Sequence, residues 1–388
     1  MSEAKPFRIE VAEEVLARLR ERVVAYRWFP EPDGGAAGWA YGTEGATLRT
    51  LQAHWLEAYD WRAAEAELNL YPHYKAEIDG LDVHFVHIQG EAGGKRPLLL
   101  THGWPGSVYE FWQAIPKLAW PSQHGGTAED AFDLIIPSLP GYGWSGKPVR
   151  PLGQRATAAL WDKLMRETLG YDSYLAQGGD WGSVVTSWLG VNHGPGKGGC
   201  RAIHLNMIGL RPTDGTPNNE AEKAWLAQTQ AAMQAEGAYF MQQATKPQTL
   251  AWALMDSPMG QLAWILEKFH GWSDLSEKSL LDVYSPDQLL TNVMIYLVND
   301  AFATSVWYYN AVFQEGGITL PEGQLCDTPT AFANYPGEKL YRAPPRSWAE
   351  RAYTVTRWQE MPRGGHFAAM EVPDLFVDDV RAWAREIA

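Results

Sequence analysis

The sequence predicts an α/β fold, a mostly parallel sheet with helices on both faces, a helical cap and a helical N-terminal extension. Three observations predict it. Short apolar segments alternate with helical segments through the middle of the chain, which is typical of buried parallel strands. Strand signals vanish between about residues 213 and 316 and then resume, and helical periodicity dominates the first 80 residues. We therefore expect an arm at 1–80, a core at 81–212 and 317–388, and a cap at 213–316.

The composition indicates a globular protein and argues against several kinds of partner. The chain has 388 residues, 46% of them hydrophobic and 20% charged, which suits a globular protein with a sizeable core. A formal net charge of −14 argues against nucleic acid or an anionic membrane as the main partner. The two cysteines, Cys200 and Cys326, form no metal-ligand pattern and are expected to be reduced, so we expect no metal. No apolar run is long enough to span a bilayer, and a cytoplasmic location is the expectation.

The first 80 residues carry packing signals and no evident chemistry. Apolar residues at helical spacing predict a first helix from about residue 11 to 23. A segment rich in Gly, Pro and aromatic residues follows at 27–43, and two further helices are expected at 46–58 and 61–70. We interpret this region as an extension that braces the lid.

The core and cap elements follow in order. Strands are predicted at 81–88, 96–101, 132–137, 174–176, 201–207, 328–333 and 353–358. Core helices are predicted at 108–118, 155–169, 184–189 and 375–387, and cap helices at 220–237, 249–269, 285–299 and 301–313.

The sequence around Asp180 has the pattern of a nucleophile elbow. Glycines stand at 178, 179 and 182, between an apolar strand and a helix, and an aspartate occupies the position where serine hydrolases have serine. A serine attacking an sp³ carbon would leave an ether that water does not readily cleave. A carboxylate leaves an ester, which a second step hydrolyses. The aspartate therefore indicates an alkyl electrophile, an epoxide or an alkyl halide, rather than an ester or amide substrate. The alternative, that Asp180 is a turn residue that caps the following helix, stays open on this motif alone.

His366 is the predicted base that activates water. It follows a Gly pair and precedes a helix start late in the chain, where this architecture places its base. Imidazole accepts a proton from water near neutral pH. The rival, His102, stands at a strand end before a Gly-x-Pro turn, and we interpret it as structural.

An acid is expected between the nucleophile and the histidine to orient the base. The candidates outside the cap are Asp327, Glu338, Glu350 and Glu360. Glu338 is the choice, because it follows the C-terminal end of a predicted strand, where active-site loops gather in open α/β sheets. Asp327 precedes the same strand and is expected at the opposite end.

Two backbone N–H groups are expected to form an oxyanion hole. One belongs to Trp181, directly after the nucleophile, and the other to Trp104 in the turn that follows residue 101. The two indole side chains are expected to wall the pocket.

Three motifs and the arm together establish a resemblance. His102-Gly103-Trp104-Pro105-Gly106-Ser107, Gly178-Gly179-Asp180-Trp181-Gly182-Ser183 and Gly364-Gly365-His366-Phe367-Ala368-Ala369 resemble those of epoxide hydrolases of the α/β-hydrolase superfamily, in the microsomal-type branch. The resemblance covers nearly the whole chain and implies the α/β-hydrolase fold. It also implies two cap tyrosines that bind the epoxide oxygen. Tyr239 matches the first, and Tyr309 is preferred to Tyr308 for the second.

The resemblance implies an epoxide hydrolase that forms a vicinal diol through an Asp180 ester, without cofactor or metal. Expected partners are a small-molecule epoxide and water, with no nucleic acid and no membrane; a homodimer, and a role in detoxification or biosynthesis, stay open. Two alternatives are a haloalkane dehalogenase, with Trp104 and Trp181 binding the halide, and a non-catalytic ligand receptor of the same fold.

Overall fold

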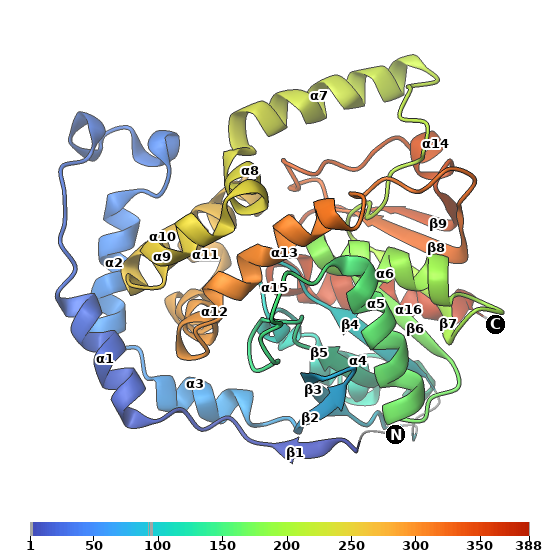
Figure 1. Ribbon diagram of the computed structural model, residues 1–388, viewed down its shortest axis with the longest axis horizontal. Coiled ribbons are helices and arrows are strands. Elements are labelled where there is room, and N and C mark those ends of the chain that lie inside the picture. The colour runs from blue at the N-terminus through green and yellow to red at the C-terminus, as the bar shows by residue number, and fades with distance from the viewer. Residues whose placement is uncertain (1–2, 92, 94–95, 388) are drawn as a thin grey trace.

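A nine-stranded sheet forms the centre of the protein in a computed structural model that describes residues 3–91, 93 and 96–387 (Figure 1). Residues 1–2 and 388, the ends of the predicted arm and core, lie outside the described residues. The strands are β1 (Lys5–Phe7), β2 (His73–Ile78), β3 (Leu81–Ile88), β4 (Pro97–Thr101), β5 (Asp133–Pro137), β6 (Tyr174–Gly178), β7 (Cys200–Leu205), β8 (Cys326–Asn334) and β9 (Tyr353–Glu360).

The strand order is β1-β2-β3-β5-β4-β6-β7-β8-β9. The six strands from β5 to β9 in this order pair in parallel, and β1, β2 and β3 add an antiparallel edge. Strands β5 and β6 are buried along their whole length, because helices cover both faces of a parallel sheet. The carboxyl ends of β4 and β6 are neighbours, with Thr101 opposite Gly178, which brings two of the sequence motifs together.

The core helices are α4 (Ile115–Ala119), α5 (Gln154–Lys163), α6 (Asp180–His193), α14 (Arg346–Ala349), α15 (Ala368–Glu371) and α16 (Pro373–Glu386). Helices α5 and α6 lie in front of the sheet in Figure 1, and α16 lies behind it. Cys200 and Cys326 are free and buried.

The chain between the end of β7 and the start of β8 forms a helical cap. Its helices are α7 (Glu220–Glu236), α8 (Ala238–Thr245), α9 (Pro247–Leu254), α10 (Pro258–Trp272), α11 (Leu280–Val283), α12 (Pro286–Val298) and α13 (Phe302–Gln314). Among the described residues no single helix has the length and apolar composition of a membrane span; α12 and α13 pass only as a pair bent by 86°.

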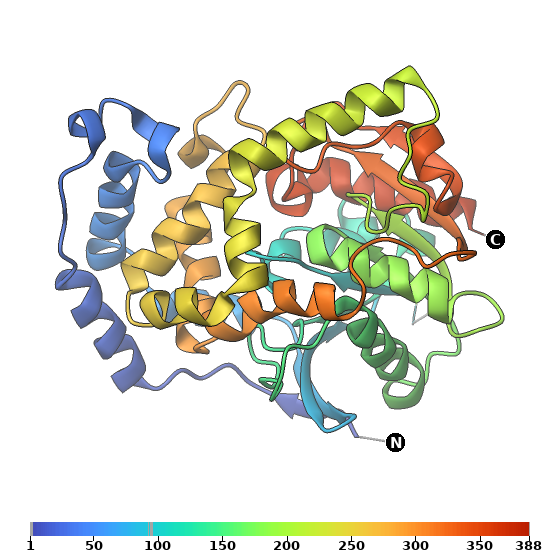
Figure 2. The same ribbon diagram turned by 45° about the horizontal axis from the view of Figure 1, so that its top comes forward.

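The N-terminal arm contains α1 (Glu13–Val24), α2 (Gly45–Glu57) and α3 (Trp61–Leu68), as predicted. Between α1 and α2 the chain forms only 3₁₀ turns, at Pro32–Gly35 and Gly38–Tyr41. Helices α1 and α2 pack against α10 and α12 of the cap (Figure 2).

The arm also holds two strands that the periodicity did not predict. β1 has three residues, too few for a pattern to emerge. β2 pairs with β3 across Asp79-Gly80, where both residues have positive φ (52° and 79°). An Asp-Gly pair is a strong hairpin signal, so the sequence did contain the evidence for β2.

Two predicted helices are interrupted at proline. The segment 108–118 is a 3₁₀ turn, Val108–Phe111, followed by α4, which begins beside Pro116. The segment 249–269 is divided into α9 and α10 by Pro258, with Ser257 accepting a hydrogen bond from the Gly260 N–H as N-cap. Proline lacks the N–H that a continuous helix needs, so each helix restarts there.

Candidate active site

The turn between β6 and α6 places Asp180 at the end of the sheet. Asp180 has φ of 48°, in the left-handed region that non-glycine residues rarely occupy. A Cβ at Gly182 would lie 1.9 Å from the Thr101 carbonyl oxygen, and one at Gly178 would lie 2.2 Å from that of Gly182. Glycine is therefore required where the turn crosses β4, as a nucleophile elbow demands.

The Asp180 carboxylate is buried and each of its oxygens faces a different group. The Trp104 backbone N–H donates a hydrogen bond to Oδ1 at 2.8 Å. His366 Nε2 lies 3.3 Å from Oδ2. One oxygen is thus bound by a fixed backbone donor, and the other faces the histidine.

His366 and Glu338 form a hydrogen-bonded pair through His366 Nδ1 and Glu338 Oε2. The other carboxylate oxygen, Oε1, accepts from the backbone N–H groups of Leu340 (3.1 Å) and Tyr341 (2.9 Å), which fixes the carboxylate. Burial opposes a charge on His366, but the adjacent carboxylates of Glu338 and Asp180 outweigh it and raise its pKa well above the ordinary value.

The rival acids lie elsewhere. Asp327 forms an ion pair with Lys197 at 3.0 Å, and Glu350 pairs with Arg346 at 2.7 Å. Glu360 accepts hydrogen bonds from the side chains of Asn334 and Trp358. Of the four candidates, Glu338 is the one that the structure places against His366.

His102 is enclosed beside the elbow. Its Nε2 accepts a hydrogen bond from the Leu139 N–H, and its Nδ1 lies 3.0 Å from the Gly103 carbonyl oxygen. Burial lowers the pKa of His102 to about 4, so the ring is neutral at physiological pH. These contacts agree with a structural role.

Tyr239, from α8, and Tyr309, from α13, come together over the elbow. Their ring centroids are 5.9 Å apart, and the Tyr309 ring meets Trp181 edge-on at 4.7 Å. The buried Tyr309 hydroxyl has no hydrogen-bond partner among the described residues. The neighbouring Tyr308 hydroxyl instead donates to Thr157 Oγ1 at 2.8 Å, so it is already engaged.

A cavity of about 310 Å³ reaches Asp180 and Trp181. Its walls are mostly apolar and come from α6, from α7 and α13 of the cap, and from the segments that join cap to core. Such a volume suits a small organic molecule.

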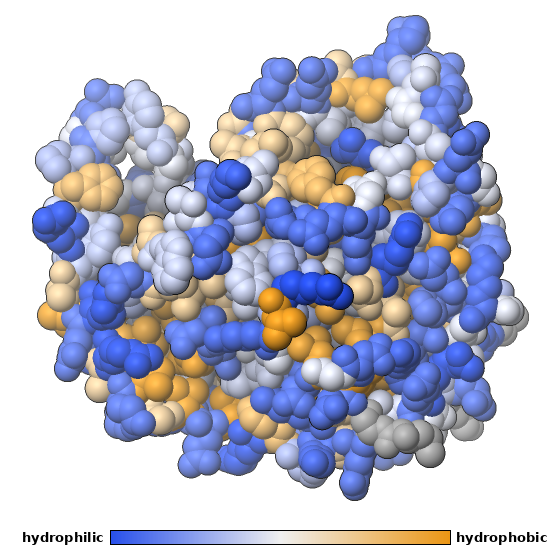
Figure 3. Space-filling view, in the orientation of Figure 1, coloured by the Kyte–Doolittle hydropathy of each residue, from blue (hydrophilic) through white to orange (hydrophobic). Residues whose placement is uncertain are grey.

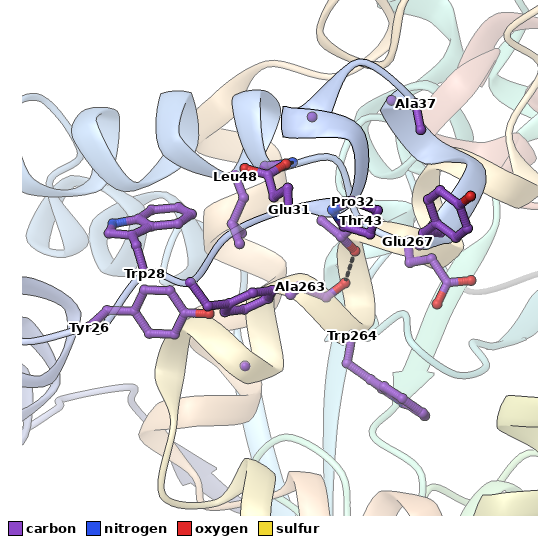
Figure 4. Close-up of a pocket in the computed structure, with 17 residues that line it drawn as sticks. Tyr26, Trp28, Glu31, Pro32, Ala37, Thr43, Leu48, Ala263, Trp264 and Glu267 are labelled. Atoms are coloured by element: carbon purple, nitrogen blue, oxygen red, sulfur yellow. Dashed lines mark hydrogen bonds between the residues drawn. The ribbon is translucent and has the colours of Figure 1, made fainter.

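A different cavity, of about 480 Å³, lies between the arm and α10 (Figure 4). None of the predicted site residues lines it. Thr43 Oγ1 donates to the Ala263 carbonyl oxygen across it at 2.6 Å. In Figure 3 the surface is hollowed between the arm and the cap.

Comparison with known proteins places this chain in a family. Residues 4–111 match the family described as epoxide hydrolase N terminus, and residues 96–248 match the alpha/beta hydrolase fold. The chain is 34% identical to Epoxide hydrolase 1 of Sus scrofa over 97% of this chain and 87% of the relative. The chain belongs to the epoxide hydrolase family. A protein of Stigmatella aurantiaca, named provisionally as an epoxide hydrolase, is 43% identical over 98% of this chain and 85% of its own.

Solved epoxide hydrolases share the complete fold. The Aspergillus niger epoxide hydrolase superposes with a TM-score of 0.83 at 30% identity, covering 99% of this chain and 97% of that one. The juvenile hormone epoxide hydrolase of Bombyx mori gives 0.83 at 32% identity, covering 100% and 94%. The predicted α/β-hydrolase fold and epoxide hydrolase family are therefore confirmed.

In this epoxide hydrolase, two polar side chains that the sequence did not lead us to predict lie beside Tyr239. The Tyr341 hydroxyl lies 2.7 Å from the Tyr239 hydroxyl, and Lys268 Nζ lies 4.4 Å from the centre of the Tyr239 ring. Tyr341 follows Glu338 by three residues, so the loop that holds the acid also carries this hydroxyl. Nothing in the local sequence marks Lys268, because the contact joins two cap helices.

Proposed function

We propose that the protein hydrolyses an epoxide to a vicinal diol, with Asp180 as nucleophile and His366 as base. One observation carries the proposal: Asp180 stands on a glycine elbow with Trp104 N–H on one carboxylate oxygen and His366, paired with Glu338, 3.3 Å from the other. No step of the scheme requires a metal or cofactor.

The first step opens the ring. Oδ1 is held by Trp104, so Oδ2 is the oxygen that attacks a ring carbon, and the carbon–oxygen bond of the epoxide breaks. Tyr239 or Tyr309 supplies a proton to the departing oxygen. Burial raises the pKa of both phenols well above the ordinary value, so both are protonated donors in the resting enzyme. The product is a hydroxyalkyl ester of Asp180.

The second step hydrolyses the ester. His366, in its neutral form, takes a proton from water, and the hydroxide attacks the ester carbonyl. That carbonyl oxygen is Oδ1, which already receives the Trp104 N–H; Trp181, at the start of α6, supplies the second N–H. The intermediate collapses, the diol oxygen takes the proton from His366, and Asp180 ionises to restore the tyrosine.

The test uses the His366→Gln variant with styrene oxide. We expect the ester to form and persist, so the intact mass rises by one substrate on the peptide containing Asp180, and the parent enzyme forms the diol. Asp180→Asn, verified to remain Asn, is the matched control and should form no adduct. Diol from the parent without any adduct in His366→Gln would contradict the two-step scheme.

No specific observation favours either alternative function, a haloalkane dehalogenase or a non-catalytic ligand receptor. The indole N–H groups of Trp104 and Trp181 are buried without partners among the described residues, as a halide site would need. The indoles of Trp161, Trp348 and Trp383 share this property, so it does not single out a halide site. Halide release from a chloroalkane would favour dehalogenation. Ligand binding without turnover of any epoxide would favour a receptor.

A further inference from the structure

Arg211 lies on the wall of the cavity that reaches Asp180. It stands where the chain leaves the core for the cap. Its backbone N–H donates to the Ile318 carbonyl oxygen at 2.8 Å, and its own carbonyl oxygen accepts from the Leu320 N–H at 2.9 Å. The returning segment therefore holds Arg211 through both of its backbone polar groups.

The guanidinium of Arg211 has no hydrogen-bond or ion-pair partner among the described side chains. Two other arginines of intermediate exposure are paired: Arg351 with Asp214 and Glu222, and Arg357 with Asp379 and Glu386. Arg211 is only partly exposed, and burial lowers its pKa. A desolvated cation without a partner is costly, and in a chain of net charge −14 its presence in a cavity calls for a ligand.

The rest of the cavity favours a ligand with an apolar body and with polar groups for Asp180 and Arg211. Asp180 is the one acidic side chain among the described residues that line it. Met207, Phe240 and Val312 are among the apolar side chains of its walls. Arg211 interacts electrostatically with Tyr341, and both residues line the same cavity as Asp180.

We propose that Arg211 binds a carboxylate on the substrate, so that the preferred substrate is an apolar epoxide carrying a carboxylate away from the ring. A guanidinium matches a carboxylate with two parallel hydrogen bonds, which gives orientation as well as affinity. The inference rests on the proposed epoxide hydrolysis and names the substrate class of that same site.

The experiment compares terminal epoxides of increasing chain length that end in a carboxylate, each paired with its primary amide. The amide has nearly the same shape and no charge. We measure kcat/KM for each pair in the parent, in Arg211→Gln and in Arg211→Lys, and use the acid-to-amide ratio, which cancels intrinsic ring reactivity.

We expect the parent to prefer the acid, with the preference peaking at one chain length that matches the distance from Asp180 to Arg211. In Arg211→Gln the ratio should fall by roughly 10- to 100-fold, mainly through KM. Arg211→Lys should retain part of the preference, because it keeps the charge and loses the paired geometry. Arg342→Gln is the matched control. Arg342 lines the same cavity, but it is exposed and its Nε donates to the Lys339 carbonyl oxygen, so its ratio should fall less.

Three results would overturn the inference: no acid preference in the parent, an equal loss for acid and amide in Arg211→Gln, or a larger fall in Arg342→Gln. Turnover of the amides shows that epoxide hydrolysis itself stands in each of these cases. Absence of turnover with every acid and every amide would contradict the proposed function instead.

Discussion

At the residue scale, Tyr239, a proposed proton donor, has the hydroxyl of Tyr341 beside its own hydroxyl. Tyr239 has one proton to give, so when it donates to the epoxide oxygen, Tyr341 is the group that donates to Tyr239. That hydrogen bond strengthens as Tyr239 acquires negative charge. Tyr341 is positioned for this by its own N–H, which donates to Glu338.

We predict that Tyr341→Phe slows ring opening about fivefold, the effect of losing a hydrogen bond worth about 1 kcal/mol. The measurement is the single-turnover rate of ester formation in the His366→Gln background. Tyr308→Phe is the control, because that hydroxyl donates to Thr157, and it should change the rate less. Equal rates in Tyr341→Phe and its background would contradict a role for Tyr341 in the first step.

Glu110 supplies a second residue-scale prediction, on stability. It is buried in the 3₁₀ turn after the Trp104 loop, and burial raises its pKa to about 8. The unfolded value is about 4.3, so folding favours the protonated form. This contribution to stability is complete below about pH 4, declines progressively as pH rises, and is lost by the time pH has passed 8.

Glu110→Gln keeps the shape of the protonated acid and cannot ionise. We therefore expect the melting temperature of the parent to fall more steeply between about pH 5 and 8 than that of the variant. Thermal unfolding followed across this range provides the measurement. Parallel pH profiles for the two proteins would show that Glu110 does not titrate as described.

At the element scale, glycine and proline decide where sequence patterns succeed. The elbow was predictable because its glycines are set by local crowding, and the His366 loop because a Gly pair precedes it. The broken helices at Pro116 and Pro258 were missed because apolar periodicity continues across the break. The sequence did not predict that Tyr341 and Arg211 lie at the active-site cavity, because their neighbours there come from cap and core segments that are distant in sequence.

We predict that Gly182→Ala prevents correct folding or abolishes activity, because its Cβ would meet the backbone of β4 at 1.9 Å. Gly271, in α10, is the matched control: a Cβ there meets nothing within 4 Å, and Gly271→Ala should raise stability by up to about 1 kcal/mol. Soluble expression, circular dichroism and diol formation are the measurements. A fully active Gly182→Ala enzyme would show that the elbow relaxes more than its backbone contacts allow.

At the scale of the whole molecule, the N-terminal arm connects the sheet to the cap. β1 pairs with β2 at the sheet edge, and α1 and α2 then pack on α10 and α12 (Figures 1 and 2). The Arg22–Asp256 ion pair and the Thr43–Ala263 hydrogen bond add polar links. Cap and core are therefore expected to unfold together.

We predict that Leu51→Ala, at a fully buried position of α2, lowers the free energy of unfolding by about 2–5 kcal/mol. Calorimetry should show one transition that moves to lower temperature as a whole. Leu70→Ala, at an exposed position, is the control and should have little effect. A separate early transition in Leu51→Ala would show that the cap unfolds on its own.

The contact between His366 and Asp180 has a consequence for the second step of the proposed reaction. The carboxylates of Glu338 and Asp180 both raise the pKa of His366 and so favour the imidazolium form, which cannot accept a proton. In the proposed scheme, conversion of Asp180 to an ester removes one of these two charges, so the pKa of His366 falls and the neutral form that the second step requires is favoured. Formation of the ester therefore promotes the form of the base that hydrolyses it.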